Sequence, residues 1–434
     1  MIEFFIVICI AALLIVWKQR RRRQQDRLHQ NQLEQNQREG IKAPASLHPF
    51  VDVTRCIGCG SCVAACPEKT VLGLVNMKAT LVQPDHCVGH GKCEAVCPTG
   101  AITLVLGSRD NGVEVPVTDE FFETTVPGIY VIGELRGIGL IRNSLLQGLE
   151  CIDGIAAKPR RNGADYDVAI VGAGPAGLGA TLQAAAKELR YVTLEQEDIG
   201  GTVLKFPRRK VVMTAPLNLP GYGKVHFRDV LKEDLLTEWE KIIKKTGVQI
   251  HARKRVEKIT ASGESFEVVA SGEKYTANHV ILALGRRGTP RKLGAPGEHL
   301  PKVIYQLDDP QQFTGRNCLV IGGGDSALEC ALMLNEAGSR VSFSYRQKNI
   351  SRAKPRNRQQ FEAAVQAGRI DSYMPSQVKE ITPEAVRLEI EGVEKVIPND
   401  DVIIMAGGIL PFEFLKELGI AMRTLHGEPM LEKT

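Results

Sequence analysis

This sequence has few aromatic side chains, and outside its N-terminal region it has almost no excess of charge of either sign. Phe, Trp and Tyr make up 5% of the 434 residues. The net charge is +5, but residues 18–27 carry six Lys or Arg against Asp26, and residues 1–17 carry only Glu3, so the remainder sums to about +1. A nearly neutral remainder gives no support for a nucleic-acid-binding surface.

The chain opens with an uncharged apolar run at residues 4–17, followed by the basic residues of 18–27. A cleaved signal peptide has the opposite order, with positive charge before the run. The pattern predicts one transmembrane helix over 1–17, with the basic cluster holding the soluble domains on the cytoplasmic side of the cell inner membrane. A buried or interfacial helix is the alternative. The Gln-rich residues 28–47 predict a flexible tether.

Disulfide scaffolds do not explain the cysteines, because seven of the 11 lie between Cys56 and Cys97. The segment CIGCGSCVAACP has the spacing C-x2-C-x2-C-x3-C-P, which is typical of iron–sulfur ligation. Three closely spaced thiolates bind three corners of one cluster, and the fourth serves another cluster. A zinc site is the alternative, but zinc favours paired C-x2-C units.

A second run, CVGHGKCEAVCP, places a histidine at the second ligand position of the same template. The first cluster is predicted to be held by Cys56, Cys59, Cys62 and Cys97. The second is predicted to be held by Cys66, Cys87 and Cys93, with His90 as the candidate fourth ligand. An imidazole in place of a thiolate raises the reduction potential. The alternatives are a three-iron cluster, or no second cluster, with His90 as a bystander. Residues 50–106 resemble the bacterial two-cluster 4Fe-4S ferredoxins.

Two glycine-rich turns follow, each after a short apolar strand. The first has Gly172, Gly174 and Gly177, with Glu195 at the end of the next strand. Strand, turn, Ala-rich helix, strand and acid in that order predict a dinucleotide site, in which the acid bonds a ribose.

The second turn has Gly322, Gly324 and Ala327, and its second strand ends without an acid. Arg346 and Arg352 follow instead. Arginines in place of the acid favour a 2′-phosphate, hence NADP(H), although NADH stays open.

Two nucleotide folds in this order resemble the thioredoxin-reductase-like pyridine nucleotide oxidoreductases. Matching pieces include residues 199–202 with Gly201, residues 282–298 with Gly285, and residues 403–411. The resemblance implies FAD on the first fold and NADP on the second. The family's disulfide reductases carry a C-x-x-C before the second turn, but here Cys318 stands alone and Cys330 lies past the turn. Both are therefore interpreted as core residues.

The family's terminal FAD-binding segment stands upstream in this chain. Residues 118–157 contain PGIYVIGE, with Gly133 and Glu134 in place of the usual Gly–Asp. This indicates a circularly permuted flavoprotein, since neighbouring surface termini tolerate such rewiring. The alternative is an extended ferredoxin domain.

The predicted fold class is α/β: two Rossmann-like nucleotide-binding domains for FAD and NADP, a small α+β ferredoxin domain and one N-terminal transmembrane helix. The predicted domains are a membrane helix (1–17), a basic and then Gln-rich linker (18–47) and a ferredoxin domain (48–112). They are followed by a permuted FAD segment (113–160), the FAD domain (165–299), the NAD(P) domain (300–410) and a return to the FAD domain (411–434).

The function expected is transfer of electrons between NAD(P)H, FAD and iron–sulfur clusters, to or from a redox partner that is either a membrane or a soluble protein. A homodimer is one option for the assembly. The alternatives are a disulfide or thiol reductase and a non-catalytic electron-transfer or redox-sensor subunit. No protein-side nucleophile or catalytic triad is found in the sequence.

Overall fold

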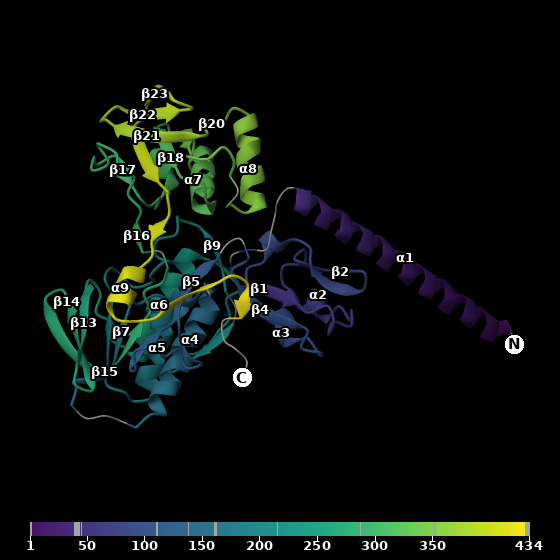
Figure 1. The fold of residues 1–434 in the computed structure, drawn as a ribbon, viewed down its shortest axis with the longest axis horizontal. Coiled ribbons are helices and arrows are strands. Elements are labelled where there is room, and N and C mark those ends of the chain that lie inside the picture. The colour runs from purple at the N-terminus through teal and green to yellow at the C-terminus, as the bar shows by residue number, and fades with distance from the viewer. Residues whose placement is uncertain are drawn as a thin grey trace. The chain divides into compact units, whose positions relative to one another are not determined.

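The computed structural model describes most of the chain, which divides into two compact units. Unit 1 comprises the described residues up to Val115 and from Arg423 onward, and unit 2 runs from Pro116 to Met422 (Figure 1). The described residues are 2–38, 44, 46–109, 112–137, 139–159, 163–214, 216–286, 288–350 and 353–429.

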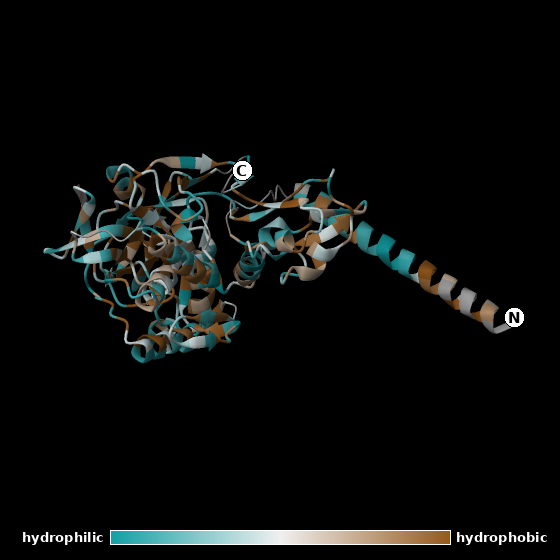
Figure 2. Ribbon diagram, turned by 90° about the horizontal axis from the view of Figure 1, so that it is seen from below, coloured by the Kyte–Doolittle hydropathy of each residue, from teal (hydrophilic) through white to brown (hydrophobic). Residues whose placement is uncertain are grey.

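Unit 1 begins with one long helix, α1 (Ile2–Arg38). Figure 2 shows the change along it, from apolar residues to hydrophilic residues farther from the N-terminus. The uncharged run of 14 residues at 4–17 spans only about 21 Å as a helix, short of a bilayer core of about 30 Å.

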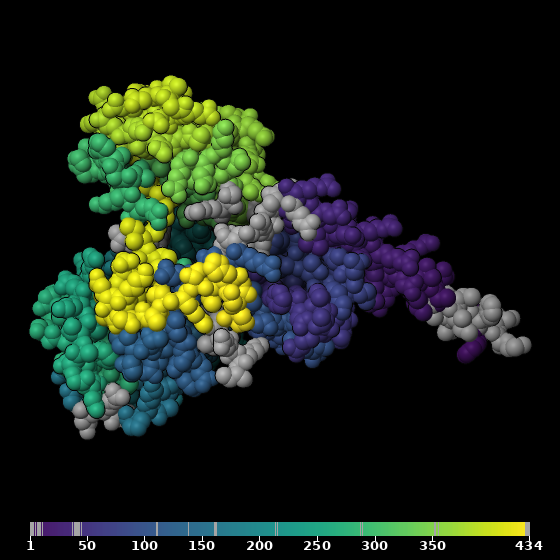
Figure 3. Space-filling view, in the orientation of Figure 1, coloured from purple at the N-terminus to yellow at the C-terminus, as the bar shows by residue number. Residues whose placement is uncertain are grey.

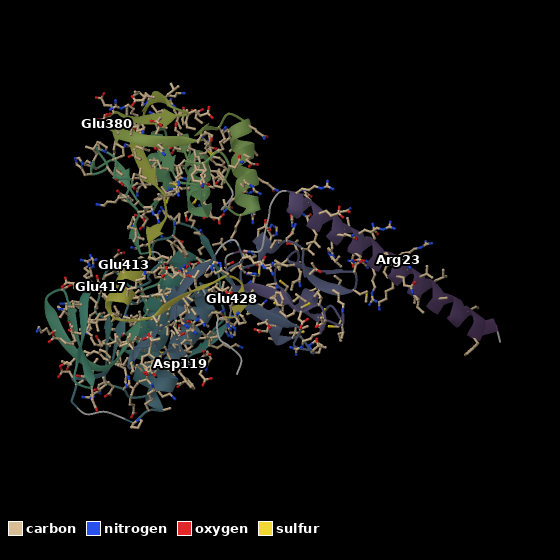
Figure 4. All side chains as sticks on the ribbon, in the orientation of Figure 1. Arg23, Asp119, Glu380, Glu413, Glu417 and Glu428 are labelled. Carbon is tan, nitrogen blue, oxygen red and sulfur yellow. The ribbon has the colours of Figure 1, made fainter. Side chains whose placement is uncertain are left out.

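The prediction of a transmembrane helix is wrong, because no helix in the described part of the chain is long and apolar enough to cross a membrane. The physical reason is that α1 runs directly from its short apolar part into the charged residues of 18–27, such as Arg23 (Figure 4). The single-pass inner-membrane location inferred from that helix is wrong for the same reason.

The second half of α1 packs on unit 1 and is not a flexible tether up to Arg38. Asn36 is buried, and its Nδ2 donates to the Val82 carbonyl at 2.6 Å. His29 Nδ1 lies 3.1 Å from the Leu74 carbonyl oxygen, and the Asn76 amide donates to Asp26 Oδ1 at 2.9 Å. Figure 3 shows this part of the helix, in purple, against the rest of the unit. The Gln-rich residues here favour a helix by propensity, and the three hydrogen-bond contacts with residues 74–82 hold the helix on the unit.

The remainder of unit 1 is a small α+β module with an internal repeat. Two short helices, each following a cysteine loop, pack beside a strand pair and a hairpin, as the predicted ferredoxin domain requires. The elements are β1 (His48–Val51) antiparallel to β4 (Ile102–Leu106), the hairpin β2 (Leu72–Val75) and β3 (Lys78–Leu81), α2 (Ser61–Ala65), α3 (Lys92–Ala95) and the 3-10 turn η1 (Pro84–His86).

The C-terminal strands also belong to unit 1. Strand β27 (Glu428–Pro429) pairs with β4, which makes the sheet order β1-β4-β27, and β26 (Met422–Leu425) pairs with β5 (Val113–Pro116). Glu428, labelled in Figure 4, accepts a hydrogen bond from the His426 amide. The predicted return of 411–434 to the FAD domain therefore differs from the structure beyond Met422.

The first sheet of unit 2 has the order β13-β14-β15-β7-β8, with β6 also paired to β15. Strands β6, β15, β7 and β8 are parallel, and β13 and β14 form an antiparallel extension. The strands are β6 (Ile129–Val131), β7 (Tyr166–Val171), β8 (Tyr191–Leu194), β13 (Val256–Ser262), β14 (Ser265–Ala270) and β15 (Glu273–Leu282). The parallel strands read as continuous apolar runs because both of their faces are buried.

The helices α4 (Ile141–Ala156) and α5 (Pro175–Ala186) cross closely on this sheet. A Cβ on Gly148 would lie 2.3 Å from the Ala176 carbonyl oxygen, and one on Gly179 would lie 2.3 Å from that of Leu145. Only glycine fits at either position. The segment predicted to be permuted thus contributes both a strand and a tightly packed helix to the sheet that carries the first glycine turn.

A second parallel sheet has the order β17-β24-β18-β19-β20, and its core includes the rings of Phe343 and Phe361, which contact each other at a tilt of 54°. Its elements are β17 (Val303–Ile304), β18 (Asn317–Ile321), α7 (Asp325–Glu336), β19 (Arg340–Ser344), α8 (Pro355–Gln366), β20 (Ile370–Tyr373) and β24 (Asp401–Ile404). Both sheets follow the strand–turn–helix–strand order of Rossmann-type domains, so this part of the predicted fold class is confirmed.

The remaining elements of unit 2 are short strand pairs, one three-stranded sheet and connecting helices. They are η2 (Gly133–Arg136), β9 (Val211–Met213) with β12 (Asp229–Leu231), β10 (Leu217–Leu219) with β11 (Gly223–Val225), α6 (Lys232–Thr246), β16 (Thr289–Pro290) with β25 (Gly408–Ile409), η3 (Pro310–Phe313), β21 (Ser376–Ile381), β22 (Ala385–Ile390), β23 (Val393–Pro398) and α9 (Phe412–Glu417).

Candidate functional site

The eight predicted iron–sulfur ligands line two separate cavities of unit 1. The residues lining one cavity include Cys56, Cys59, Cys62 and Cys97. Those lining the other include Cys66, Cys87, His90 and Cys93. The structure therefore brings together each of the two sets that the sequence spacing groups.

The first cavity is formed where the cysteine loop turns back on the β2–β3 hairpin. Gly58 has a φ of +69°, and a Cβ there would lie 2.0 Å from the Met77 carbonyl oxygen. Glycine therefore permits both the backbone turn and the close approach. Without it the loop would move away from the hairpin and the three thiols would separate.

Backbone amides point at two of the thiols in this first cavity. The Ala79 amide donates to Cys56 Sγ at 3.4 Å, and the Ala101 amide donates to Cys97 Sγ at 3.2 Å. The hydrogen bond with the Ser61 hydroxyl lowers the pKa of Cys59, which is exposed. Donors of this kind favour the thiolate, the form that binds iron.

Burial makes the thiols of the second cavity hard to ionise, and it also raises the pKa of Cys62 in the first cavity. Burial raises the pKa of Cys93 to about 11, and it also raises the pKa values of Cys66 and Cys87. The negative charge of Glu68 adds to the effect at the last two. Such thiols become thiolates only beside a strong positive charge, which bound iron would supply.

His90 faces the second cavity without a hydrogen bond at its Nε2 atom. This nitrogen is buried, and the nearest carboxylate oxygen, Glu68 Oε1, lies 3.6 Å away. Within the described residues, no group of three or more His, Cys, Asp or Glu surrounds the position of a single metal ion. Each ligand set instead surrounds a cavity, as the corners of a cluster require.

The first glycine turn of unit 2 connects β7 to α5 and is closed by Glu195. A Cβ on Gly177 would lie 1.8 Å from the Gly172 carbonyl oxygen, and one on Gly172 would lie 2.6 Å from that of Ala283. The buried Glu195 carboxylate accepts the Ala173 amide at 2.6 Å. The acid at the end of β8 thus meets the turn, as a dinucleotide site requires.

The other predicted residues of the FAD site lie around the same turn. A Cβ on Gly201 would lie 2.8 Å from Gly174 Cα, so the 199–202 loop touches the start of α5. Gly285 follows β15 with a φ of +66°. Gly133 begins η2, and a Cβ there would lie 2.9 Å from the Ala176 Cβ.

Glu134 follows Gly133 in η2 and reaches across to the loop after it. A Cβ on Gly139 would lie 3.2 Å from the Glu134 Oε1 atom. The Gly133 amide donates to Gln147 Oε1 at 2.8 Å, which ties η2 to α4. The segment at 118–157 therefore places its Gly–Glu pair beside the helix that begins at the first glycine turn.

The second glycine turn connects β18 to α7. A Cβ on Gly322 would lie 2.4 Å from the Met405 carbonyl oxygen, and Ala327 is fully buried beneath the turn. Gly324 precedes α7 in extended backbone. Arg346 is exposed just past β19, whereas Arg352 lies outside the described residues.

Sequence reasoning missed two side chains at these sites. The Tyr345 ring lies over the second turn, since a Cβ on Gly323 would be 2.2 Å from it. Glu68 lines the second cysteine cavity. Two sequence signals could have found them. Tyr345 directly precedes Arg346, and Glu68 stands two residues after Cys66.

Two families match this chain. Residues 169–434 match the pyridine nucleotide-disulphide oxidoreductase family, and residues 48–98 match the 4Fe-4S dicluster domain. The first match covers more than half of the chain. The chain therefore belongs to the pyridine nucleotide-disulphide oxidoreductase family.

Curated relatives and a solved structure agree with that assignment. A ferredoxin–NADP reductase of Ignicoccus hospitalis is 32% identical over 265 residues, which are 59% of this chain and 82% of the relative. A thioredoxin reductase of Listeria monocytogenes is 30% identical over 270 residues, 59% of this chain and 77% of the relative. The bacillithiol disulfide reductase Bdr of Staphylococcus aureus has 26% identity and a TM-score of 0.53, with 59% of this chain and 80% of that chain covered.

The class of the protein follows from the fold, the two glycine turns and these matches together. It is an FAD-dependent NAD(P)H oxidoreductase that carries an iron–sulfur domain. The resemblance predicted from the sequence, to this family and to the dicluster ferredoxins, is confirmed.

Proposed function

We propose that this enzyme transfers electrons between NADPH, FAD and two iron–sulfur clusters, and exchanges single electrons with a redox partner protein. The observation that carries the proposal is that the eight predicted ligands line two separate cavities, four in each, in the same chain as a dinucleotide-binding flavoprotein fold. A flavin supplies the needed chemistry, because it accepts a hydride and releases electrons one at a time.

The first glycine turn is proposed to hold FAD. The α5 N-terminus and the closely approached glycines would face the pyrophosphate, and Glu195 would bond a ribose. Gly133 and Glu134 lie beside the start of the same helix. We therefore propose that residues 113–160 supply the terminal FAD segment of a circularly permuted flavoprotein, supported by the parallel pairing of β6 with β15.

NADPH is proposed to bind at the second turn. Arg346 follows the end of β19, the place where NADH-binding folds carry an acid. Its guanidinium forms no ion pair with any described residue. An arginine at this place suits the 2′-phosphate of NADPH. The Tyr345 ring beside Gly323 narrows the approach to the turn.

A thiol or disulfide reductase is the competing function, because two relatives are named for such substrates. Cys318 and Cys330, the two thiols nearest the second turn in sequence, are 1% and 2% exposed. Burial raises the pKa of Cys318 to about 12, and it raises the pKa of Cys330 as well. Thiols that are buried and protonated are poor nucleophiles, which favours the electron-transfer function.

Cofactor content tests the proposal. The anaerobically reconstituted protein should contain one FAD and about eight iron per chain, with matching acid-labile sulfide. The measurement combines flavin release with iron, sulfide and zinc analysis. Zinc in place of iron would exclude electron transfer through unit 1, and FAD without NADPH oxidation would favour a non-catalytic subunit.

A further inference from the structure

Glu68 shares the second cysteine cavity with His90. Both residues line it together with Cys66, Cys87 and Cys93. Glu68 lies two residues after Cys66, whose Sγ is 3.2 Å from the Glu68 carbonyl oxygen, so the backbone folds around the thiol and carries the carboxylate to the cavity.

The contact between Glu68 and His90 is not a hydrogen bond. Oε1 and Nε2 are 3.6 Å apart, beyond hydrogen-bond range. Nε2 is nevertheless buried without a hydrogen-bond partner. Among the described side chains, none donates a hydrogen bond to the Glu68 carboxylate. The Glu68 side chain is 34% exposed and open to water, so the buried nitrogen is the atom that needs a partner.

The distance is at the upper limit for two ligands of one metal ion. An iron of a cubane cluster already binds three sulfides, so two protein ligands would make it five-coordinate. Nitrogen and oxygen ligands about 2.0–2.2 Å from such an iron, at angles of about 90–110°, lie about 2.8–3.6 Å apart. Imidazole and carboxylate are both ordinary ligands of iron. The three cysteines of this cavity account for three corners of a cluster, which leaves one iron for the pair.

We propose that Glu68 and His90 both bind the one iron of the second cluster that no cysteine binds. This inference rests on the proposed function, because it requires an iron–sulfur cluster in this cavity. The carboxylate restores the negative charge that the exchange of cysteine for histidine removes. The fourth iron is then held by two side chains, and each alone holds it more weakly.

Four variants of the full chain test the pair: Glu68→Ala, His90→Ala, the double variant and the control Glu94→Ala. Glu94 is a carboxylate next to Cys93 that does not line the cavity, so the control removes the same charge near the cluster. The fourth iron is removed by mild oxidation, and ferrous iron is titrated back. Electron paramagnetic resonance follows the three-iron signal, and FAD content and the first cluster report on folding.

The wild type and Glu94→Ala should rebind ferrous iron equally well. The affinity of each single variant for ferrous iron should be lower by a factor of about ten or more, which is the loss typical of changes at metal sites. The double variant should show the full three-iron signal as isolated. None of these readouts uses NADPH, so a failure of electron transfer would not be confused with a failure of this ligand assignment.

The proposal would be overturned if Glu68→Ala rebound iron as tightly as Glu94→Ala. It would also be overturned if His90→Ala already matched the double variant, because Glu68 would then hold no iron. A wild-type protein with a full three-iron signal that ferrous iron does not convert, or with no second cluster, would overturn it too.

Discussion

At the scale of single residues, the sequence predicts best those side chains whose roles follow from local spacing. Cys56, Cys59 and Cys62 lie on one loop, and their grouping follows from that loop alone. Cys97 joins them from the second run because the module repeats. Glu68 was not predicted, because nothing in a single carboxylate signals that the chain folds it toward His90.

Arg346 provides a residue-scale prediction about coenzyme choice. Arg346→Ala should weaken the binding of NADPH by about 10–100-fold, because a hydrogen bond between charged groups contributes about 1.5–3 kcal/mol. NADH, which lacks the 2′-phosphate, should bind as before. Dissociation constants from flavin fluorescence provide the measurement. Arg340→Ala, at the opposite end of β19, is the matched control. Equal weakening of both coenzymes would contradict the assignment.

At the scale of elements, strands and glycine turns could be predicted because their patterns are short and local. The helix α1 could not be predicted beyond its apolar part. The Gln-rich residues have favourable helix propensities but no apolar stripe that would mark a packed helix, and the contacts of α1 with Leu74, Asn76 and Val82 come from a hairpin far along the chain. Tertiary contacts determine the structure of this segment.

Asn36 tests that explanation for α1. Asn36→Ala should release the second half of the helix, because the buried Val82 carbonyl loses its donor at a cost of about 1–3 kcal/mol. Hydrogen exchange of residues 26–36 should become faster. Asn31→Ala, at an exposed position of the same helix, should leave exchange unchanged. Unchanged protection in Asn36→Ala would show that the contact does not hold the helix.

Gly148 tests the crossing of α4 and α5. Gly148→Ala should lower the free energy of unfolding by about 1–3 kcal/mol, because the added methyl group meets backbone atoms of α5. The melting temperature and FAD retention should both fall. Gly154→Ala lies in the same helix and faces the half-exposed Phe121 side chain, which is able to move. If both variants melted alike, the crossing would not depend on close approach.

At the scale of the whole molecule, the order of segments along the chain differs from their order in the fold. The upstream strand β6 pairs with β15, a placement that the PGIYVIGE motif made predictable. The turn at 119–123, capped by Asp119 (Figure 4), leads into that strand. The addition of β27 to β4 could not be predicted, because a two-residue strand has no sequence signature.

Removing residues 423–434 tests the contribution of the C-terminal strands. The deletion removes β27 from the sheet with β4 and leaves β5 without β26. Unit 1 should lose stability and iron, whereas FAD binding at the Gly172 turn should remain. The iron-to-FAD ratio is the measurement. A control deletion of 430–434 keeps both strands and should keep the ratio. A normal ratio in the longer deletion would contradict this role.

The most direct test of the central claim is anaerobic stopped-flow mixing in both directions. The oxidised enzyme is mixed with NADPH, and the chemically reduced enzyme is mixed with NADP⁺, while flavin and cluster absorbance are recorded together. In at least one direction, both sets of bands should change within one turnover, and a Cys59→Ser/Cys62→Ser variant should lose much of the cluster change while keeping the flavin change. Clusters that keep their oxidation state in both directions, while the flavin reacts, would contradict the account.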